Sequence, residues 1–147
     1  MSEKKLKNIF VEGAIIGAFI GTCIQKHSSK TGIGGHSIFL GQVRADMTNE
    51  KKVAAIEYTT YEEMALEKMT EIREAIFEKY DLECMHVYHS LGKVAAGEIS
   101  LFVFTSSEHR KTAIGACSET VERIKAELPV WGKELLEDET HQWKVNN

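Results

Sequence analysis

The chain has 147 residues, of which 43% are hydrophobic and 27% are charged. These values are typical of a soluble globular protein, and the length predicts one domain that spans residues 1–147. The net charge of −4 argues against a nucleic-acid-binding protein, which needs a basic excess or a basic face. An anionic ligand must therefore be held by local basic side chains.

The first sixty residues predict short elements joined by polar loops. The apolar stretch at 14–24 is eleven residues long, and a helix needs about twenty to span a bilayer, so we expect a buried helix there. It also lacks the features of a signal peptide, which predicts a cytoplasmic protein without a membrane segment. In chain order we expect a flexible extension (1–8), a strand (8–12), a helix (13–25), a polar loop (26–35), a strand (36–43), a charged loop (44–52) and a strand (53–59).

Two apolar stripes predict long helices over residues 61–80 and 107–128. Thr60 and Glu63 match a capping box at the start of the first, and Pro129 ends the second, because proline disfavours helical backbone in the preceding residue. Strands are expected at 83–90 and 98–106, with a turn at 91–93. The stripes consist of Tyr61, Ala65, Met69, Ile72 and Ile76, and of Ile114, Cys117, Val121, Ile124 and Leu128.

The order of these elements predicts an α+β fold. Strands and helices interleave without strict alternation, which favours a mixed or antiparallel sheet with two main helices over a doubly wound parallel sheet. The cysteines Cys23, Cys84 and Cys117 are odd in number and far apart, without a C-x-x-C pair. This pattern predicts buried free thiols in a reducing compartment.

Basic residues are the strongest candidates for chemistry. His109 and Arg110 fall in the first turn of the second long helix, where free N–H groups and the helix dipole favour an anion such as phosphate. The same residues also fit a capped, solvated helix start that binds no ligand. Lys125 lies fifteen residues after Arg110, on the same side of the helix in projection and close to the apolar stripe. Such a lysine can have a lowered pKa and act as nucleophile or base, or it can simply extend to solvent.

Two further basic residues follow element ends. Arg44 comes directly after a buried strand, and Lys133 follows the proline that ends the second helix. Together with His109, Arg110 and Lys125, they could surround one anionic substrate. His86 and His89 point to opposite faces of a strand, which makes the pair a poor metal chelator. The "GIGG" segment lacks the spacing of a dinucleotide site.

Several segments together resemble the large, catalytic subunit of molybdopterin synthase. They occur in that family's order between residues 34 and 143, and the late Trp143 closes the set. The segments are "FLGQVR", "IEYTTYEEMA", "HSLGKVAAGE", "SSEHRKTA" and "ERIKAELPVWGKE".

The resemblance implies an α/β-hammerhead-like fold and a sulfurtransferase of molybdenum cofactor biosynthesis. Such an enzyme converts cyclic pyranopterin monophosphate (precursor Z) into molybdopterin. Its sulfur donor is the thiocarboxylated C-terminus of a small ubiquitin-like subunit. The family assembles as a homodimer of large subunits within a heterotetramer, so the implied partners are that small subunit and a second copy of the chain. Neither a metal nor another cofactor is implied, and neither is a nucleic acid or a membrane.

The resemblance also assigns roles to residues. It implies that Lys125 and Lys133 are catalytic. The implied substrate-binding residues are Gln42, Val43, Arg44, His109, Arg110, Lys125, Gly132, Lys133 and Glu134.

One departure concerns the segment after the proline. The family usually has a lysine directly after the tryptophan, whereas this chain has Gly132, and Ser90 stands where an arginine is common. Lys133 could take over from the missing lysine, because glycine leaves the backbone free to re-aim it. The alternatives are a paralogue that binds the small subunit without turnover, or an unrelated phosphometabolite-binding domain that uses His109 and Arg110.

Overall fold

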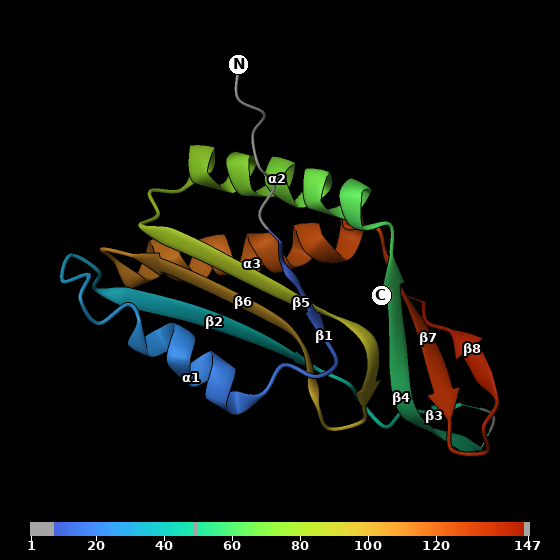
Figure 1. Ribbon diagram of the computed structural model, residues 1–147. Helices are drawn as coiled ribbons and strands as arrows, with labels where there is room; N and C mark the ends of the chain where they lie inside the picture. Colours follow the sequence, from blue (N-terminus) through green and yellow to red (C-terminus); the bar gives the residue numbers. More distant parts are fainter. Residues whose placement is uncertain (1–7, 49, 146–147) are drawn as a thin grey trace.

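The computed structural model describes residues 8–48 and 50–145 (Figure 1). Within these residues an eight-stranded sheet has the order β2-β6-β5-β4-β7-β8, with β1 beside β5 and β3 beside β4. All pairings are antiparallel except β1–β5. The elements are β1 (Phe10–Glu12), α1 (Gly17–Gln25), β2 (Gly35–Gln42), β3 (Met47–Thr48), β4 (Lys51–Thr60), α2 (Glu62–Lys79), β5 (Cys84–Ala95), β6 (Ile99–Ser107), α3 (Arg110–Glu127), β7 (Val130–Leu136) and β8 (His141–Trp143).

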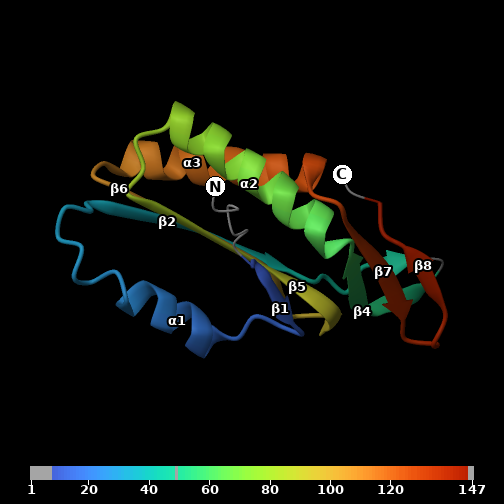
Figure 2. The ribbon, with the colours of Figure 1, turned by 45° about the horizontal axis from the view of Figure 1, so that its top comes forward.

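The sheet is covered on both faces. Helices α2 and α3 lie side by side on one face, and α1 lies on the other (Figure 2). The largest core cluster joins α2 and α3 to the sheet, and a second cluster places Cys23 of α1 against Phe102 and Phe104 of β6. A third cluster fills the end formed by β4 and β7. The predicted α+β class is confirmed, and so are the buried free cysteines Cys23, Cys84 and Cys117.

Helix α2 matches its predicted stripe except at the start. Tyr61 is the N-cap residue and is exposed, while the other four members of the stripe are buried. The predicted capping box is wrong, because no side chain caps this helix. The Thr60 hydroxyl instead donates to the Pro129 carbonyl oxygen at 2.6 Å, which ties the end of β4 to the start of β7.

Helix α3 begins later than predicted. Strand β6 extends through Ser107, and His109 is the N-cap residue. Ile114 is exposed, so its place in the stripe was wrong; the buried face is built instead from small residues such as Ala113 and Ala116. The predicted end is confirmed, since α3 stops at Glu127 just before Pro129.

Strand β5 does not end at the predicted turn over 91–93. It runs on to Ala95 and changes partner, because residues 84–89 pair with β6 whereas residues 92–95 pair with β4. Gly92 makes the change with a φ of 79°, and a Cβ atom there would collide with the Glu12 carboxylate. Glycine is therefore strongly favoured at this point of the strand.

The remaining differences lie in short elements. The predicted helix over 13–25 begins only at Gly17, the charged loop contains β3 and the start of β4, and β7 and β8 were not predicted. Apart from Asn8, the expected extension at 1–8 lies outside the described residues. No helix within the described ranges is both long and apolar enough to cross a membrane.

Replacing Gly92 tests the partner change in β5. An alanine at this positive φ should lower the free energy of unfolding by about 1–2 kcal/mol, measured by urea denaturation. Gly21→Ala is the matched control, because Gly21 lies inside α1 with no heavy atom within 4 Å of the added methyl group. The control should raise stability by up to about 1 kcal/mol; equal stability of the two variants would contradict the proposed strain.

Candidate active site

A small pocket lies where the end of α3 meets β4, β5, β7 and the chain after β8. It encloses about 30 Å³, close to the room that one or two small atoms need. This volume suits a single reacting group and not a whole ring system. Its lining consists of Tyr58, His89, Ile124, Lys125, Leu128, Val130, Gly132 and Lys144.

The proline stop positions two walls of this pocket. Lys125 lies in the last turn of α3, and Leu128 caps the helix by donating its N–H to the Ile124 carbonyl at 3.0 Å. Pro129 then turns the chain into β7, which pairs antiparallel with β4 so that Gly132 lies opposite Tyr58. Lys125 of α3 and Gly132 of β7, only seven residues apart in sequence, therefore line the same pocket.

Lys125 and Lys144 supply the positive charge of the pocket. Lys125 as a whole remains exposed, but crowding by protein atoms around it lowers the pKa of its ammonium group, and the charge of Lys144 lowers this pKa further. Lys144 is half-buried and is held in place because its N–H donates to the Gly132 carbonyl at 2.8 Å. The pair can bind an anion. The lowered pKa also increases the fraction of Lys125 that is a neutral amine.

His89 forms the buried floor of the pocket. Burial lowers its pKa to about 4 despite a bond from Nδ1 to the Ser90 carbonyl oxygen, and Lys125 and Lys144 act in the same direction as burial. The imidazole is therefore neutral at pH 7, and donation by Nδ1 leaves Nε2 as an acceptor. The Tyr58 ring meets it edge-on at 5.1 Å between centroids.

A hydrogen bond orients the Tyr58 side chain. Its hydroxyl donates to Ser100 Oγ at 3.1 Å. Burial raises the pKa of this phenol, and Glu134 raises it further, against the effect of the Ser100 bond. Tyr58 is therefore protonated at neutral pH, with its one O–H donated to Ser100, and its oxygen can only accept a hydrogen bond from a group in the pocket.

Gly132 leaves little room for a side chain. An added Cβ atom would lie 2.9 Å from Ile56 Cγ2 and 3.4 Å from a Tyr58 ring carbon. A lysine at this position would therefore require Ile56 to move. The second cation of the pocket comes instead from Lys144, the residue bonded to the Gly132 carbonyl.

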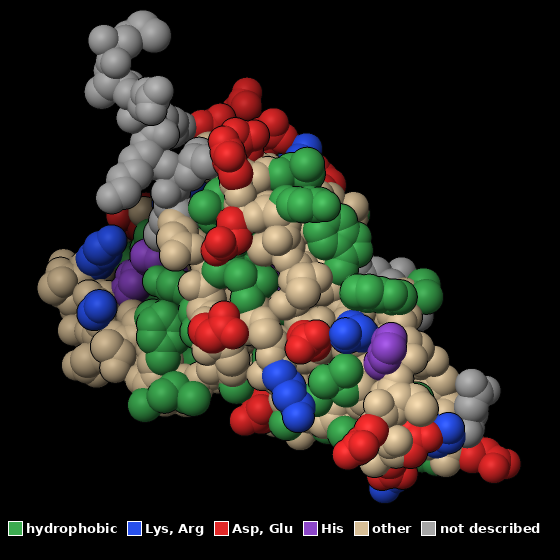
Figure 3. Space-filling view, turned by 45° about the vertical axis from the view of Figure 1, so that its right-hand side comes forward, with side chains coloured by type: hydrophobic (Ala, Val, Ile, Leu, Met, Phe, Trp, Pro, Cys, Tyr) green, Lys and Arg blue, Asp and Glu red, His purple; other side chains and the backbone are tan. Residues whose placement is uncertain are grey.

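Lys133 lies on the other side of β7. Neighbouring residues of a strand point to opposite faces, and Lys133 pairs with Glu57 of β4, with Nζ and Oε1 3.4 Å apart. This face also carries Trp131, which lines an apolar groove of about 430 Å³. Exposed hydrophobic side chains gather on this side of the molecule (Figure 3). The groove is lined by Thr59, Thr60, Tyr61, Trp131 and Trp143.

The other predicted residues are not all brought together within one chain. His109 and Arg110 are exposed at the start of α3, about 22 Å along the helix axis from Lys125. The shared side in projection thus did not mean proximity. Arg44 is exposed and pairs with Asp46 at 3.2 Å, just beyond β2.

The neighbours of Arg44 have different environments. Gln42 is exposed at the end of β2. Val43 is buried in the cluster that also contains Ile56 and Leu136, which places this segment at the β4–β7 end of the sheet. Glu134 lies on the Gly132 side of β7 and accepts a bond from Gln142 at 3.1 Å.

Three pocket residues escaped prediction: Lys144, His89 and Tyr58. Lys144 follows Trp143 in a segment with no helical or strand periodicity, so nothing local marked it. His89 was interpreted only as a structural histidine beside His86, although its burial in the pocket depends on β4 and α3. Tyr58 falls within a segment that resembled the family, but only the pairing of β4 with β7 places it opposite Gly132.

A family of known proteins matches the part of the chain that holds most of the segments named above. The sequence profile of the family described as MoaE protein matches residues 18–127. The chain belongs to the MoaE family. The match contains the "FLGQVR" segment and Lys125, while Gly132 and Lys144 lie beyond it.

Two curated relatives of this MoaE chain share one name. The molybdopterin synthase catalytic subunit of Drosophila willistoni is 41% identical over 117 residues, which cover 78% of this chain and 31% of that protein. The subunit of the same name from Pyrococcus abyssi is 35% identical over 115 residues, covering 78% of this chain and 76% of that protein. The chain thus spans about a third of the length of the Drosophila relative.

Solved structures share the MoaE fold described above. Molybdopterin synthase from Staphylococcus aureus superposes with a TM-score of 0.80 at 29% identity, covering 92% of this chain and 95% of that one. A complex of subunits 1 and 2 of molybdopterin-converting factor from Helicobacter pylori gives a TM-score of 0.78 at 19% identity, covering 94% and 90%. The latter likeness concerns the fold alone.

The buried His89 predicts a pH dependence of stability in this MoaE chain. The unfolded chain binds a proton near pH 6.5, whereas the folded chain binds it only near pH 4, so stability is lost as pH falls through this window. The loss should approach about 3 kcal/mol between pH 7 and pH 4. In His89→Gln, urea denaturation should give a flatter dependence; parallel curves for the two proteins would contradict the lowered pKa.

Proposed function

We propose that the chain is the catalytic subunit of a molybdopterin synthase. It transfers sulfur from the thiocarboxylated C-terminus of a small ubiquitin-like subunit to cyclic pyranopterin monophosphate, as a step of molybdenum cofactor biosynthesis in the cytoplasm. The observation that carries the proposal is the convergence of Lys125 and Lys144 on a pocket with room for one small group. The names of the Drosophila and Pyrococcus relatives support it.

The pocket suits the end of a polypeptide tail. A thiocarboxylate is a small anion at the end of a narrow chain, and the two ammonium groups of the pocket are complementary to it. The volume of about 30 Å³ admits this end while the pterin binds outside, within reach of the transferred sulfur. The Helicobacter pylori structure, a complex of two subunits with this fold in one of them, supports a small-subunit partner.

Lys125 has two roles in the proposal. As an ammonium it holds the thiocarboxylate together with Lys144. As a neutral amine, favoured by its lowered pKa, it serves as base or nucleophile during transfer. The chemistry asks only for these side chains and for no resident metal or cofactor.

A second copy of the chain would complete the anion site. The two ends of α3 are about 22 Å apart, so His109 and Arg110 cannot reach a group bound at Lys125 of the same chain. A homodimer can bring the start of one α3 to the end of the other, and with two small subunits it forms a heterotetramer. Arg44, with Gln42 and Val43, lies at the same end of the sheet as the pocket and belongs to the proposed substrate-binding set.

The role of each lysine can be tested by single substitution. Purified protein is mixed with precursor Z and thiocarboxylated small subunit, and molybdopterin is measured as its fluorescent oxidised derivative. Lys125→Ala should lower the rate by at least about 100-fold, the contribution of a positioned base. Lys144→Ala should cost about tenfold or more, the worth of a charge-assisted hydrogen bond.

Lys133→Ala distinguishes the two ways of replacing the lysine that Gly132 lacks. Its ion pair with Glu57 on the other face predicts a smaller loss than that of Lys144→Ala. A loss as large as that of Lys125→Ala would instead establish Lys133 as the catalytic replacement. A stable complex with the small subunit that yields no molybdopterin would refute the synthase and indicate a binding paralogue.

The pH profile of the rate reports on the lysine pair. Lys144 lowers the pKa of Lys125, so its removal should raise that pKa and shift the rise of rate with pH to higher values. Lys133→Ala is the control and should leave the midpoint unchanged. Identical midpoints in Lys144→Ala and the unsubstituted protein would show that Lys125 does not titrate in the rate-limiting step.

A further inference from the structure

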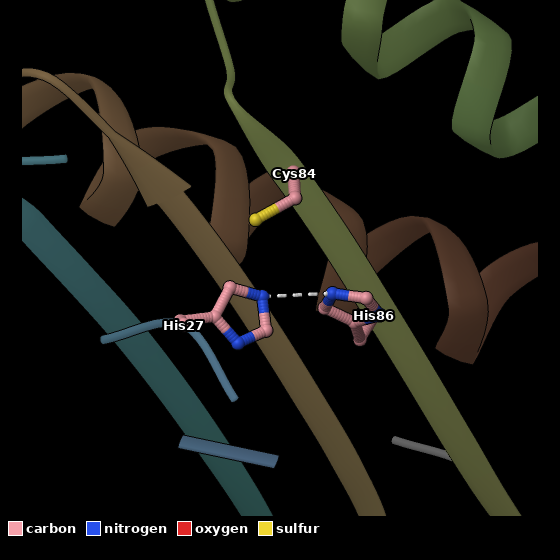
Figure 4. Close-up of side chains that lie close together, drawn as sticks. All are labelled: His27, Cys84 and His86. Atoms are coloured by element: carbon pink, nitrogen blue, oxygen red, sulfur yellow. Dashed lines mark hydrogen bonds between the residues drawn. The ribbon is translucent and has the colours of Figure 1, made fainter. Parts of the chain in front are cut away.

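Three metal-ligating side chains meet on the α1 face of the sheet, away from the lysine pocket. They are His27, in the turn after α1, and Cys84 and His86, both on β5 (Figure 4). One ligand atom from each lies within 4.8 Å of those of the other two. His27 and Cys84 are buried and His86 is half-buried, so the cluster is enclosed and still reached by solvent.

Strand geometry explains why these residues converge. Cys84 and His86 are two apart on β5, so both point to the α1 face. His89 points to the other face and belongs to the lysine pocket. The pair His86–His89 is thus no chelator, as the sequence indicated, but a partner 59 residues away in sequence supplies the missing imidazole.

His27 is oriented as a ligand before any ion binds. Its Nδ1 lies 2.7 Å from the carbonyl oxygen of Cys23, the last turn of α1, and donates to it. That bond leaves the lone pair on Nε2, which faces His86 Nε2 at 3.0 Å. A ligating histidine whose other nitrogen donates to a backbone carbonyl is the usual arrangement in metal sites, because the bond sets the tautomer and the ring orientation.

The donor set selects the class of ion. Two imidazoles and one thiolate suit a borderline ion such as Zn²⁺, whose tetrahedral sites combine histidine and cysteine. Tetrahedral Zn–N bonds of about 2.05 Å would set the two nitrogens about 3.4 Å apart, slightly wider than the present contact. A water molecule on the side of the half-buried His86 would complete four ligands. The Phe104 ring, 4.8 Å from the His27 ring, forms an apolar wall.

We propose that His27, Cys84 and His86 form a zinc site that clips the end of α1 to strand β5. The site is independent of the proposed sulfur transfer, because it lies on the opposite face of the sheet and uses none of the pocket residues. Its consequence is structural: ion binding would fasten the connection between α1 and β2 to the centre of the sheet.

Metal titration of the purified, chelator-treated full chain tests the proposal. With Co²⁺ as a spectroscopic probe, the protein should show visible bands of a tetrahedral ion and a thiolate-to-cobalt charge-transfer band, at one equivalent. Zn²⁺ should displace the cobalt. Cys84→Ser should abolish the charge-transfer band and weaken Zn²⁺ binding, measured against a chromophoric chelator, by at least about tenfold.

A second ligand variant and a control variant complete the test. His86→Gln, at a half-buried position, should also weaken Zn²⁺ binding by at least about tenfold with an unchanged circular dichroism spectrum. Cys117→Ala removes another buried free thiol, on the buried side of α3, and should leave the band intact. The proposal is overturned if the unsubstituted protein gives no charge-transfer band, or if Cys84→Ser and Cys117→Ala bind Zn²⁺ equally.

Discussion

The change of partner within β5 is the constraint on which the rest of the structure depends. One continuous strand pairs with β6 up to His89 and with β4 from Gly92 onward. Glycine accepts the positive φ at this point without strain, and its lack of a side chain leaves room for the Glu12 carboxylate. Because β5 changes partner here, β4 pairs with its second half, and β7 pairs with β4. Residues of β4 and β7 then form part of the wall of the lysine pocket at the end of α3.

That arrangement concentrates positive charge in one pocket of a protein whose net charge is negative. The chain is acidic overall, yet Lys125 and Lys144 converge beside the buried, neutral His89. Burial lowers the pKa of Lys125, and the charge of Lys144 lowers it further. The arrangement is unfavourable for an empty pocket and favourable once an anion neutralises it. His109 and Arg110, at the start of α3, lie about 22 Å along the helix axis from this pair.

The two faces of β5 carry separate chemistry because its side chains alternate. His89 faces α3 and the lysine pocket, while Cys84 and His86 face α1 and meet His27. Residues three apart on one strand thus lie on opposite faces of the sheet. The sequence interpretation of His86 and His89 as a non-chelating pair was correct about the pair. It could not find His27, whose approach depends on how α1 folds back over the sheet.

Local pattern determined the elements whose signals are local: the apolar face of α2, the end of α3 before Pro129, the α+β class and the buried thiols. It failed where neighbours decide. Tyr61 and Ile114 have the spacing of buried residues but lie at helix positions that the sheet does not cover. The turn expected at 91–93 became strand because β4 offers new partners there. The sequence identified Lys125 as a candidate. Only the tertiary structure shows that Lys144, and not Lys133, lies beside it in the pocket. Alternation along β7 turns Lys133 toward Glu57, and the Gly132 carbonyl holds Lys144 at the pocket, because long-range strand pairing, not sequence spacing, sets which side chains share a site.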